Sequence, residues 1–245
     1  MNKLTIIIGL WLGSTLAPMV SAQSPTIRSF IEQYSADARS LDHRFRLPLD
    51  SAAFERRAAI TSDWLMQLRA QDFQHLDRVS QIDYLLLRSE LEYQQRKQSL
   101  DRKRDIEAAE LLPFASDLLA YCKAREDVDS IKPAEVAAKL DAASSVIEAQ
   151  IKDLKPIDSA DVSEAASRQR LKALRASELV NSLRNAVREA HGFYNTYDPM
   201  YSWWTKQPME RLLDALEKHR LALKEKLVGV PDADQNTILC LPTGR

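Results

Sequence analysis

Glycine is scarce in this chain: five glycines occur in 245 residues, and only Gly192, Gly229 and Gly244 follow the first 22 residues. Sheets whose strands are joined by tight turns use more glycine than this. Ala, Leu, Glu, Lys, Arg and Gln, which are good helix formers, instead fill long stretches without turn signals. The sequence therefore predicts an all-α protein, a multi-helix assembly of long antiparallel helices.

A charge excess is also lacking, because 34 Lys and Arg residues nearly balance 35 Asp and Glu residues. The most basic stretch, RKQSLDRKR at residues 96–104, contains an aspartate and no aromatic side chain. Nucleic-acid grooves interleave basic and aromatic residues, so this stretch does not fit one. We interpret it as a solvated helix face and expect no nucleic-acid partner.

The motifs that carry catalysis or bind metals are absent as well. None of the four histidines, His43, His75, His191 and His219, begins a His-Glu-x-x-His arrangement, and no G-x-S-x-G or glycine-rich phosphate motif occurs. We therefore assign no catalytic residue, no metal ligand and no cofactor to this chain. His191 and His219 lie on apolar stripes of neighbouring helices, where we expect hydrogen-bonded core histidines more than about 10 Å apart.

The two cysteines, Cys122 and Cys240, leave two alternatives open. In an oxidising compartment they could form a disulfide. Cys122 lies in an apolar helical context and Cys240 in a tail, which favours two free thiols instead.

The first 22 residues have the pattern of an export signal. Lys3 precedes an apolar run from Leu4 to Leu16, which is short for a membrane span, and Val20-Ser21-Ala22 is a small-x-small cleavage pattern. We expect cleavage after Ala22, no stable membrane anchor afterwards, and a periplasmic or secreted helical domain of residues 23–245. A retained membrane anchor is the alternative.

Start and stop signals place the helices of this domain. We expect a helix from near Pro25, one capped by Asp50, and a long one from Ser80, where Ser80 and Asp83 resemble a capping box. Further helices are expected from Pro113 to Arg125 and Pro133 to Leu154, with a turn at 156–161. The next helix carries an apolar stripe from Ala173 to Tyr194, and Pro208 is expected to stop a short helical piece and begin the last helix, which ends at Gly229.

Aromatic residues gather between these last long helices: six of the 17 Phe, Tyr and Trp residues lie from Phe193 to Trp204. Such rings can fill a corner between helices, and we expect at least one of Trp203 and Trp204 to be packed there. The two are adjacent and about 100° apart on a helix, so both cannot point into one core. Tyr197, Trp203 and Trp204 are therefore also candidate contacts for a substrate or partner.

Several of these segments resemble a known family. FYNTYDPMYSWW, LKEKLVG and the tail DADQNTILCLPTGR, together with SQIDYLLLRSELE nearer the start, are similar to segments of the bacterial domain of unknown function 885 family. The resemblance covers most of the chain after residue 22. It implies an exported, mostly helical protein, related to zinc-dependent peptidases of more than twice this length.

The chain departs from the family in one important respect. The family's zinc site uses a motif of the form H-E-x-x-P-G-H downstream of the P-x-G-R segment, and this sequence ends at Arg245. Cys240 also stands where the family usually has glycine. The resemblance thus implies the N-terminal part of a larger metallopeptidase-like fold, truncated before its metal-binding half.

Two functional interpretations follow, and whether the chain is itself an enzyme stays open between them. In the first, it is the N-terminal helical portion of an exported metallopeptidase-like protein, without catalysis of its own, and it helps to hold a peptide substrate in the full-length form. In the second, it is a complete short helical binding module. Helices built to pack on a missing half would leave apolar faces exposed, so self-association is expected.

Overall fold

The computed structural model describes residues 27–230, and every regular element in that range is helical. The prediction of an all-α protein is therefore confirmed. The cleavage site after Ala22 and the tail with Cys240 lie outside the described residues. The elements in chain order are α1 (Ile27–Arg44), α2 (Ser51–Arg69), the 3-10 turn η1 (Phe73–His75), α3 (Arg78–Ala109), α4 (Ala115–Glu126), α5 (Pro133–Asp153), α6 (Glu164–Tyr197), α7 (Pro199–Ala222) and the π-helical turn η2 (Leu223–Val228).

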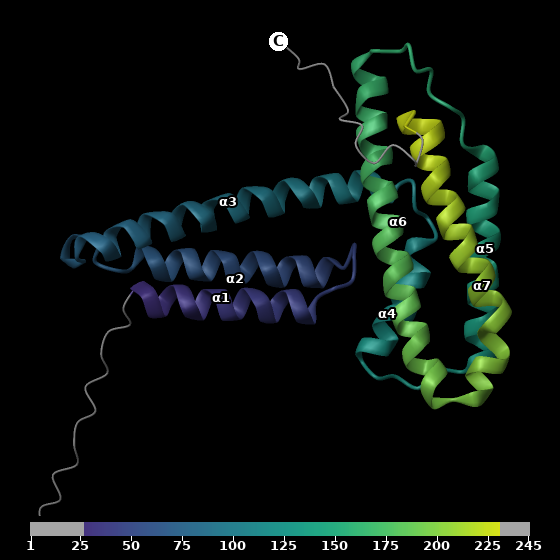
Figure 1. The fold of residues 1–245 in the computed structure, drawn as a ribbon, viewed down its shortest axis with the longest axis horizontal. Coiled ribbons are helices and arrows are strands. Elements are labelled where there is room, and N and C mark those ends of the chain that lie inside the picture. The colour runs from purple at the N-terminus through teal and green to yellow at the C-terminus, as the bar shows by residue number, and fades with distance from the viewer. Residues whose placement is uncertain (1–26, 231–245) are drawn as a thin grey trace, which may run out of the picture.

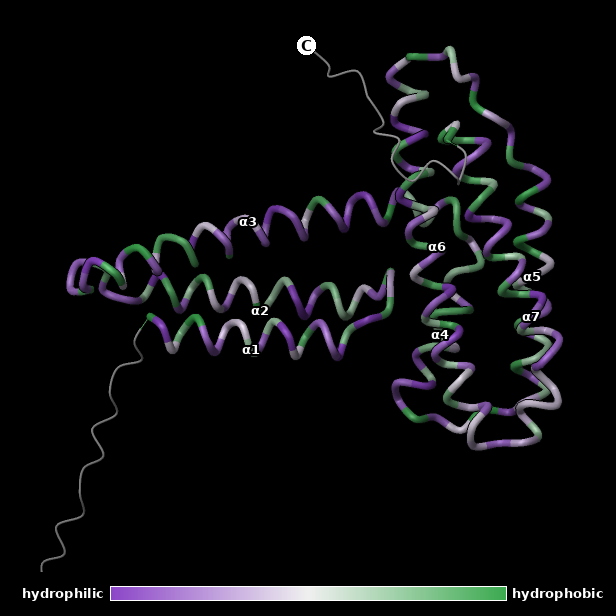
Figure 2. The backbone as a smooth tube through the Cα atoms, in the orientation of Figure 1, coloured by the Kyte–Doolittle hydropathy of each residue, from purple (hydrophilic) through white to green (hydrophobic). Residues whose placement is uncertain are grey.

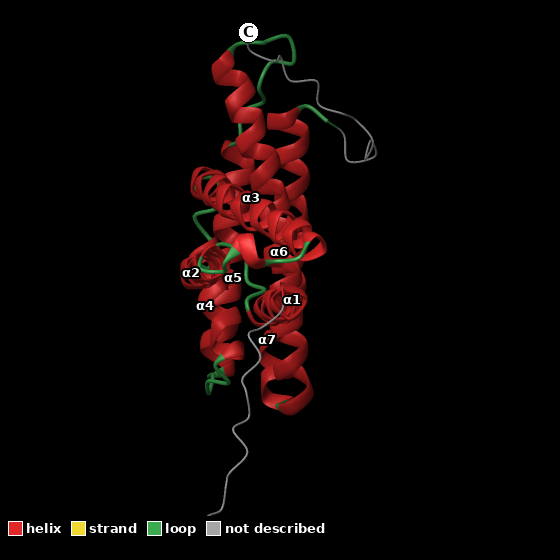
Figure 3. Ribbon diagram, turned by 90° about the vertical axis from the view of Figure 1, so that its left-hand side faces the viewer, coloured by secondary structure: helices red, strands yellow, loops and turns green. Residues whose placement is uncertain are grey.

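The helices form two units, an arm of α1–α3 and a bundle of α4–α7 (Figure 1). In the arm, α3 packs against both α1 and α2; in the bundle, α7 packs against α5 and α6. The bundle helices run crosswise to the arm, as the view along the arm shows (Figure 3). Among the described helices, none combines the length and hydropathy that a membrane span requires.

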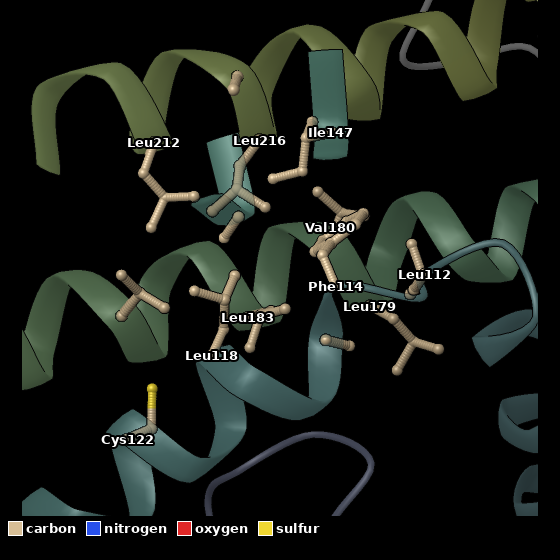
Figure 4. Packing of buried hydrophobic residues seen from close by; sticks show 14 of the residues in the cluster. Leu112, Phe114, Leu118, Cys122, Ile147, Leu179, Val180, Leu183, Leu212 and Leu216 are labelled. Atoms are coloured by element: carbon tan, nitrogen blue, oxygen red, sulfur yellow. The ribbon is translucent and has the colours of Figure 1, made fainter. Parts of the chain in front are cut away.

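The bundle holds the larger core, which is rich in leucine and alanine. Leu183, Leu212 and Leu216 are almost completely buried and point toward one another across α6 and α7 (Figure 4). Alanines at the same faces let the backbones approach closely; they are Ala143, Ala173, Ala176, Ala190 and Ala215. The stripe predicted from Ala173 to Tyr194 is buried in this core, so that prediction is confirmed.

The arm has a smaller core at its outer tip, where α1 begins, α2 ends and α3 begins. Phe30 and Trp64 meet edge-on with ring centroids 4.7 Å apart, and Leu68 and Leu91 are completely buried beside them. Figure 2 shows hydrophobic residues gathered toward this tip, whereas hydrophilic residues predominate along α3 toward the bundle. Polar contacts hold the remainder, including Trp64 Nε1 to Asp37 at 3.1 Å.

The last turn of α3 anchors the arm to the bundle. Ala108 is completely buried and belongs to the bundle core. Next to it, Arg175 of α6 contacts Asp105 of α3 at 2.6 Å, and Lys172 is hydrogen-bonded to Glu110. The Asp105 carboxylate raises the pKa of the Arg175 guanidinium, which therefore stays charged. The arm is thus fixed at its root by one helix end and two ion pairs.

Two predicted helix boundaries are wrong. The N-cap of α3 is Asp77, whose carboxylate accepts a hydrogen bond from the Ser80 backbone N–H at 2.8 Å, so Ser80 lies inside the helix. At the other end of the chain α7 continues through Pro208. Proline in a helix interior costs about 3 kcal/mol. Buried residues on both sides, Thr205 and Met209, keep the helix on one packed face, and this packing outweighs the cost.

Candidate functional site

The predicted contact residues lie at the corner where α6 meets α7, and all three are exposed. The exposed fractions are 75% for Tyr197, 71% for Trp203 and 43% for Trp204. The expectation that at least one tryptophan packs into the corner is therefore wrong. The two tryptophan rings pack edge-on against each other at 5.0 Å, and the ring of Tyr197 contacts Phe193 at 5.2 Å. No ring contact joins these two pairs.

Tyrosines fill the corner instead. Tyr201 is completely buried, and its hydroxyl lies 2.6 Å from that of Tyr121 and 3.0 Å from His191 Nδ1. Burial raises the pKa of both tyrosines, so their hydroxyls stay protonated and can serve as hydrogen-bond donors. The ring of Tyr194 packs against both. This chain of hydrogen bonds fixes the angle between α6 and α7, and it gives the aromatic-rich sequence a structural role.

The two predicted core histidines differ. His191 is half-buried and hydrogen-bonded to Tyr201, as expected. His219 is completely buried edge-on against Phe114, but neither of its ring nitrogens has a hydrogen-bond partner within residues 27–230. The expectation of a hydrogen-bonded His219 is therefore wrong. Burial lowers its pKa to about 4, so the ring is neutral at physiological pH.

Neither metal binding nor thiol chemistry has a visible site in residues 27–230. No group of three or more His, Cys, Asp or Glu side chains in that part of the chain is arranged to hold a metal ion.

Cys122 is a buried free thiol within the described residues. Burial is the main cause that raises the pKa of this thiol to about 12, and the negative charges of nearby Glu126 and Glu189 add to it. A thiol with so high a pKa forms little thiolate, so Cys122 is a poor nucleophile. Its pairing with Cys240 stays untested.

A groove lies between the arm and the bundle. It has a volume of about 1070 Å³ and lies where the end of α1 and the segment after it face α4 and α6. Its apolar lining includes Leu47, Cys122 and Ala190. Small-molecule and peptide sites are commonly found at such junctions between units. We call it the arginine groove because of its polar lining, which consists of Arg39, Ser40, His43, Arg44, Arg46, Arg125, Glu126, Ser182, Asn185 and Glu189.

Arginine dominates the charge of this groove. Four arginines face two glutamates. Within residues 27–230, Arg125 is the one of the four with an ion pair, to Glu189 at 3.6 Å. Arg46 lies 2.5 Å from His43 Nδ1. Arg39 and Arg44 have no hydrogen bond or ion pair with any described residue. Their guanidinium forks match the geometry of carboxylates and phosphates, so the groove is suited to an anionic ligand.

Arg125 connects the groove to the aromatic corner. Its guanidinium lies 5.3 Å from the ring centroid of Phe193, and its Nε is buried without a partner. A buried donor without a partner destabilises the fold, and this Nε is covered by protein atoms. Beside it, burial raises the pKa of Glu126, partly offset by Lys123 and Arg44. Glu126 therefore takes up a proton at a higher pH than an ordinary glutamate, and the groove then becomes more positive.

Little in the sequence indicates this groove. Arg39, Arg44 and Arg46 belong to a short basic segment at the end of the first helix, and Arg125 follows 79 residues after Arg46. No local motif joins them, because the fold alone brings α1, α4 and α6 together. The stretch at 96–104 is more basic than this segment, yet it does not line the groove. Its lysines and arginines lie along α3, and most of them are exposed. This agrees with its interpretation as a solvated helix face.

Comparison with known proteins adds no family to this picture. The resemblance to the domain of unknown function 885 family consequently rests on the segments quoted above and stays a prediction. No protein-family model, no curated protein and no solved structure matches the chain.

Proposed function

We propose that this chain is a helical binding module that holds an acidic peptide in the arginine groove. The observation that carries the proposal is the pair of exposed guanidiniums of Arg39 and Arg44, which make no hydrogen bond or ion pair with a described residue. They lie opposite Arg125, which is paired with Glu189, across an apolar floor. A peptide with carboxylates on alternate residues projects them roughly 7 Å apart on one side of its backbone. Such spacing lets one ligand reach arginines on both walls.

The groove also has the volume for a peptide segment. Ligand pockets usually enclose about 300 to 1000 Å³, and the arginine groove lies at the upper end of that range. Leu47 and Ala186 supply apolar surface for the small side chains between the acidic ones. Serine and asparagine at the α6 wall, Ser182 and Asn185, offer hydrogen bonds to the peptide backbone.

The test measures binding of a fluorescent peptide with alternating glutamate and alanine, beside the same peptide with glutamine in place of glutamate. We expect the glutamate peptide to bind more tightly and to weaken as salt rises. Changing both Arg39 and Arg44 to glutamine should weaken it at least about tenfold, because charge-assisted hydrogen bonds contribute about 1.5 to 3 kcal/mol each. Arg28→Gln, on α1 but outside the groove, is the matched control. Equal affinity for the two peptides would exclude the proposal.

Acidity provides an independent readout of the same site. Protonation of Glu126 removes a negative charge beside the ligand, and its raised pKa places this event above the usual range for glutamate. The affinity for the acidic peptide should therefore rise as the pH falls through that range. Glu126→Gln should bind tightly already at neutral pH and lose part of the pH dependence. An unchanged affinity in this variant would place the ligand elsewhere.

A second proposal follows from the exposed aromatic corner. Tyr197, Trp203 and Trp204 leave large aromatic rings at the surface. Exposed apolar patches of this kind often bind a partner or are covered by another segment of a protein. This supports the interpretation as the N-terminal portion of an exported metallopeptidase-like protein, in which zinc and the catalytic groups would come from outside this chain. Genomic DNA beyond the codon for Arg245 tests it: an encoded helical continuation with a His-Glu motif supports the proposal, and its absence in all three frames refutes it.

A further inference from the structure

The outer face of α3 carries a second apolar stripe, opposite the one that packs in the arm. The buried face is formed by Tyr84, Leu87 and Leu91. On the other side four exposed apolar residues follow at intervals of seven: Val79, Leu86, Tyr93 and Leu100. Their exposed fractions are 70%, 64%, 51% and 47%, and Ile82 at 50% joins them.

A repeat of seven residues has a specific meaning on a helix. It keeps one seam of side chains facing a second helix over several turns, as in coiled coils. The stripe extends over the 22 residues from Val79 to Leu100, or about 32 Å of helix. An apolar strip of this length is unusual on a solvent-exposed helix. It therefore indicates a helical partner.

The charges beside the stripe identify that partner. Four charged residues also follow at intervals of seven along one flank: Asp83, Glu90, Lys97 and Arg104. The two acidic residues lie in the first half of α3 and the two basic residues in the second. A second copy of α3 laid antiparallel, with the twofold axis at Tyr93, would place Glu90 opposite Lys97 and Asp83 opposite Arg104. In antiparallel helix pairs, flanking residues on the same side face each other.

We propose that the outer face of α3 binds a second copy of this chain, forming an antiparallel dimer whose axis passes close to Tyr93. The contact is the same patch on both copies, as twofold symmetry requires. Leu86 of one copy then lies against Leu100 of the other, and the twofold axis generates the same contact a second time. Lys97 is held within its own helix by Asp101 at 2.9 Å, an exposed ion pair that contributes little and can exchange partners.

The ends of the arm complete the contact area. The 32 residues of α3 span about 48 Å, and a strip about 10 Å wide gives roughly 500 Å² on each copy, below the ~800 Å² of a standard interface. A recess of about 650 Å³ lies where α3 meets α6. Its charged lining is mixed, with the basic residues Arg104, Arg168, Lys172 and Arg175 beside the acidic residues Asp101, Glu107 and Glu178. The antiparallel arrangement brings the other copy's tip, with Asp72 and Asp77, toward this recess. A hydrogen bond from His75 lowers the pKa of the Asp72 carboxyl. A hydrogen bond from the backbone N–H of Ser80 lowers the pKa of the Asp77 carboxyl, so both groups stay negative.

Sedimentation equilibrium of the purified chain tests the proposal. We expect a monomer–dimer equilibrium, weakened on the order of 100-fold by Leu86→Ser, which removes two leucine contacts at once. Met66→Ser is the matched control, since Met66 is also 64% exposed but lies on α2. Circular dichroism verifies that both variants stay folded. A wild-type chain that remains monomeric at all concentrations would overturn the proposal.

Charge exchange tests the orientation. Glu90→Lys and Lys97→Glu should each weaken the dimer by about tenfold, because each places like charges opposite one another twice. The double variant should recover self-association, and an equimolar mixture of the two single variants should form a mixed dimer. A parallel pair or a non-specific aggregate would show neither recovery. If both single variants associate like the wild type, the antiparallel contact is refuted.

Discussion

The arm and the bundle use buried side chains in different amounts and of different kinds. The bundle core contains 27 buried residues, many of them alanine and leucine, whereas the arm core contains eight, three of which are aromatic. Close helix packing through alanine buries area along the whole bundle. In the arm, large rings close the tip. The root combines the ion pairs of Arg175 and Lys172 with contacts of Leu47, Leu49 and Ala108 to the bundle core. The arm is therefore the region that opens at lower free energy.

Buried polar atoms without partners occur in both units of the described chain: two belong to arm residues and five to bundle residues. In the arm, the Nε of Arg57 and the Oε1 of Gln98 are buried without partners, although the Nε2 of Gln98 bonds to Thr61 at 3.1 Å. Each such group destabilises the region that contains it by about 1 to 3 kcal/mol. The arginine groove lies between the two units, so opening of the arm would change the groove. Ligand binding should in turn protect the arm.

The largest expected effect compares two completely buried leucines, Leu216 in the bundle and Leu91 in the arm. Each change to alanine should cost about 2 to 5 kcal/mol. Leu216→Ala should lower the stability of the whole protein, because the bundle holds most of the core. Leu91→Ala should speed amide hydrogen exchange in α1–α3 and leave the protection of α5–α7 unchanged. Equal loss of protection in both units would show that arm and bundle unfold together.

The fold was predictable to the extent that it depends on periodicity. The apolar stripe of α6 and the buried Met209, Leu212 and Leu216 of α7 repeat at three and four residues, so their burial could be inferred directly. Local rules failed where packing outweighs them. Pro208 was expected to end a helix, and it lies inside one because Thr205 and Met209 pack on either side of it.

The candidate site was much less predictable. The aromatic segment was visible in the sequence, yet which rings are buried depends on the angle between α6 and α7: Tyr201 is completely buried and Trp203 is 71% exposed. The arginine groove had no local pattern, since Arg44 and Arg125 meet only through the fold. Periodicity predicts one face of a helix, but not which distant residues will be opposite it.

The second prediction concerns acid, and it should affect the bundle more than the arm. Burial lowers the pKa of His219 to about 4, from an ordinary value near 6.5. Between these values the unfolded chain binds a proton that the folded chain does not, so stability falls as the pH falls from about 6.5 to about 4. The loss is about 3 kcal/mol in total. Denaturant unfolding at several pH values measures it.

Replacing His219 should remove this acid sensitivity. His219→Leu deletes the two unpartnered ring nitrogens, and it should raise stability at neutral pH by about 1 to 3 kcal/mol as well as flatten the pH profile. His75→Gln is the control on the arm, where the side chain is 85% exposed, and it should change the profile little. An unchanged slope in His219→Leu would mean that other groups cause the acid sensitivity.

The smallest expected effect is that of Trp203→Ala in the bundle, and Trp64→Ala in the arm is its comparison. Trp64 in the arm is 8% exposed, packs edge-on against Phe30 and donates to Asp37, so Trp64→Ala should destabilise the arm by about 3 to 5 kcal/mol. Trp203 in the bundle is 71% exposed and contacts mainly Trp204. Trp203→Ala should therefore change stability by less than about 0.5 kcal/mol.

Thermal unfolding followed by circular dichroism, with hydrogen exchange of the arm, measures both tryptophan variants. A stable Trp203→Ala protein can then be used in partner-binding assays without concern for its fold, which makes it the appropriate variant for testing the aromatic corner as a contact surface. If Trp203→Ala instead destabilises the bundle as much as Trp64→Ala destabilises the arm, the ring is packed in solution. The corner would then be part of the core, and its large rings would need no partner to explain them.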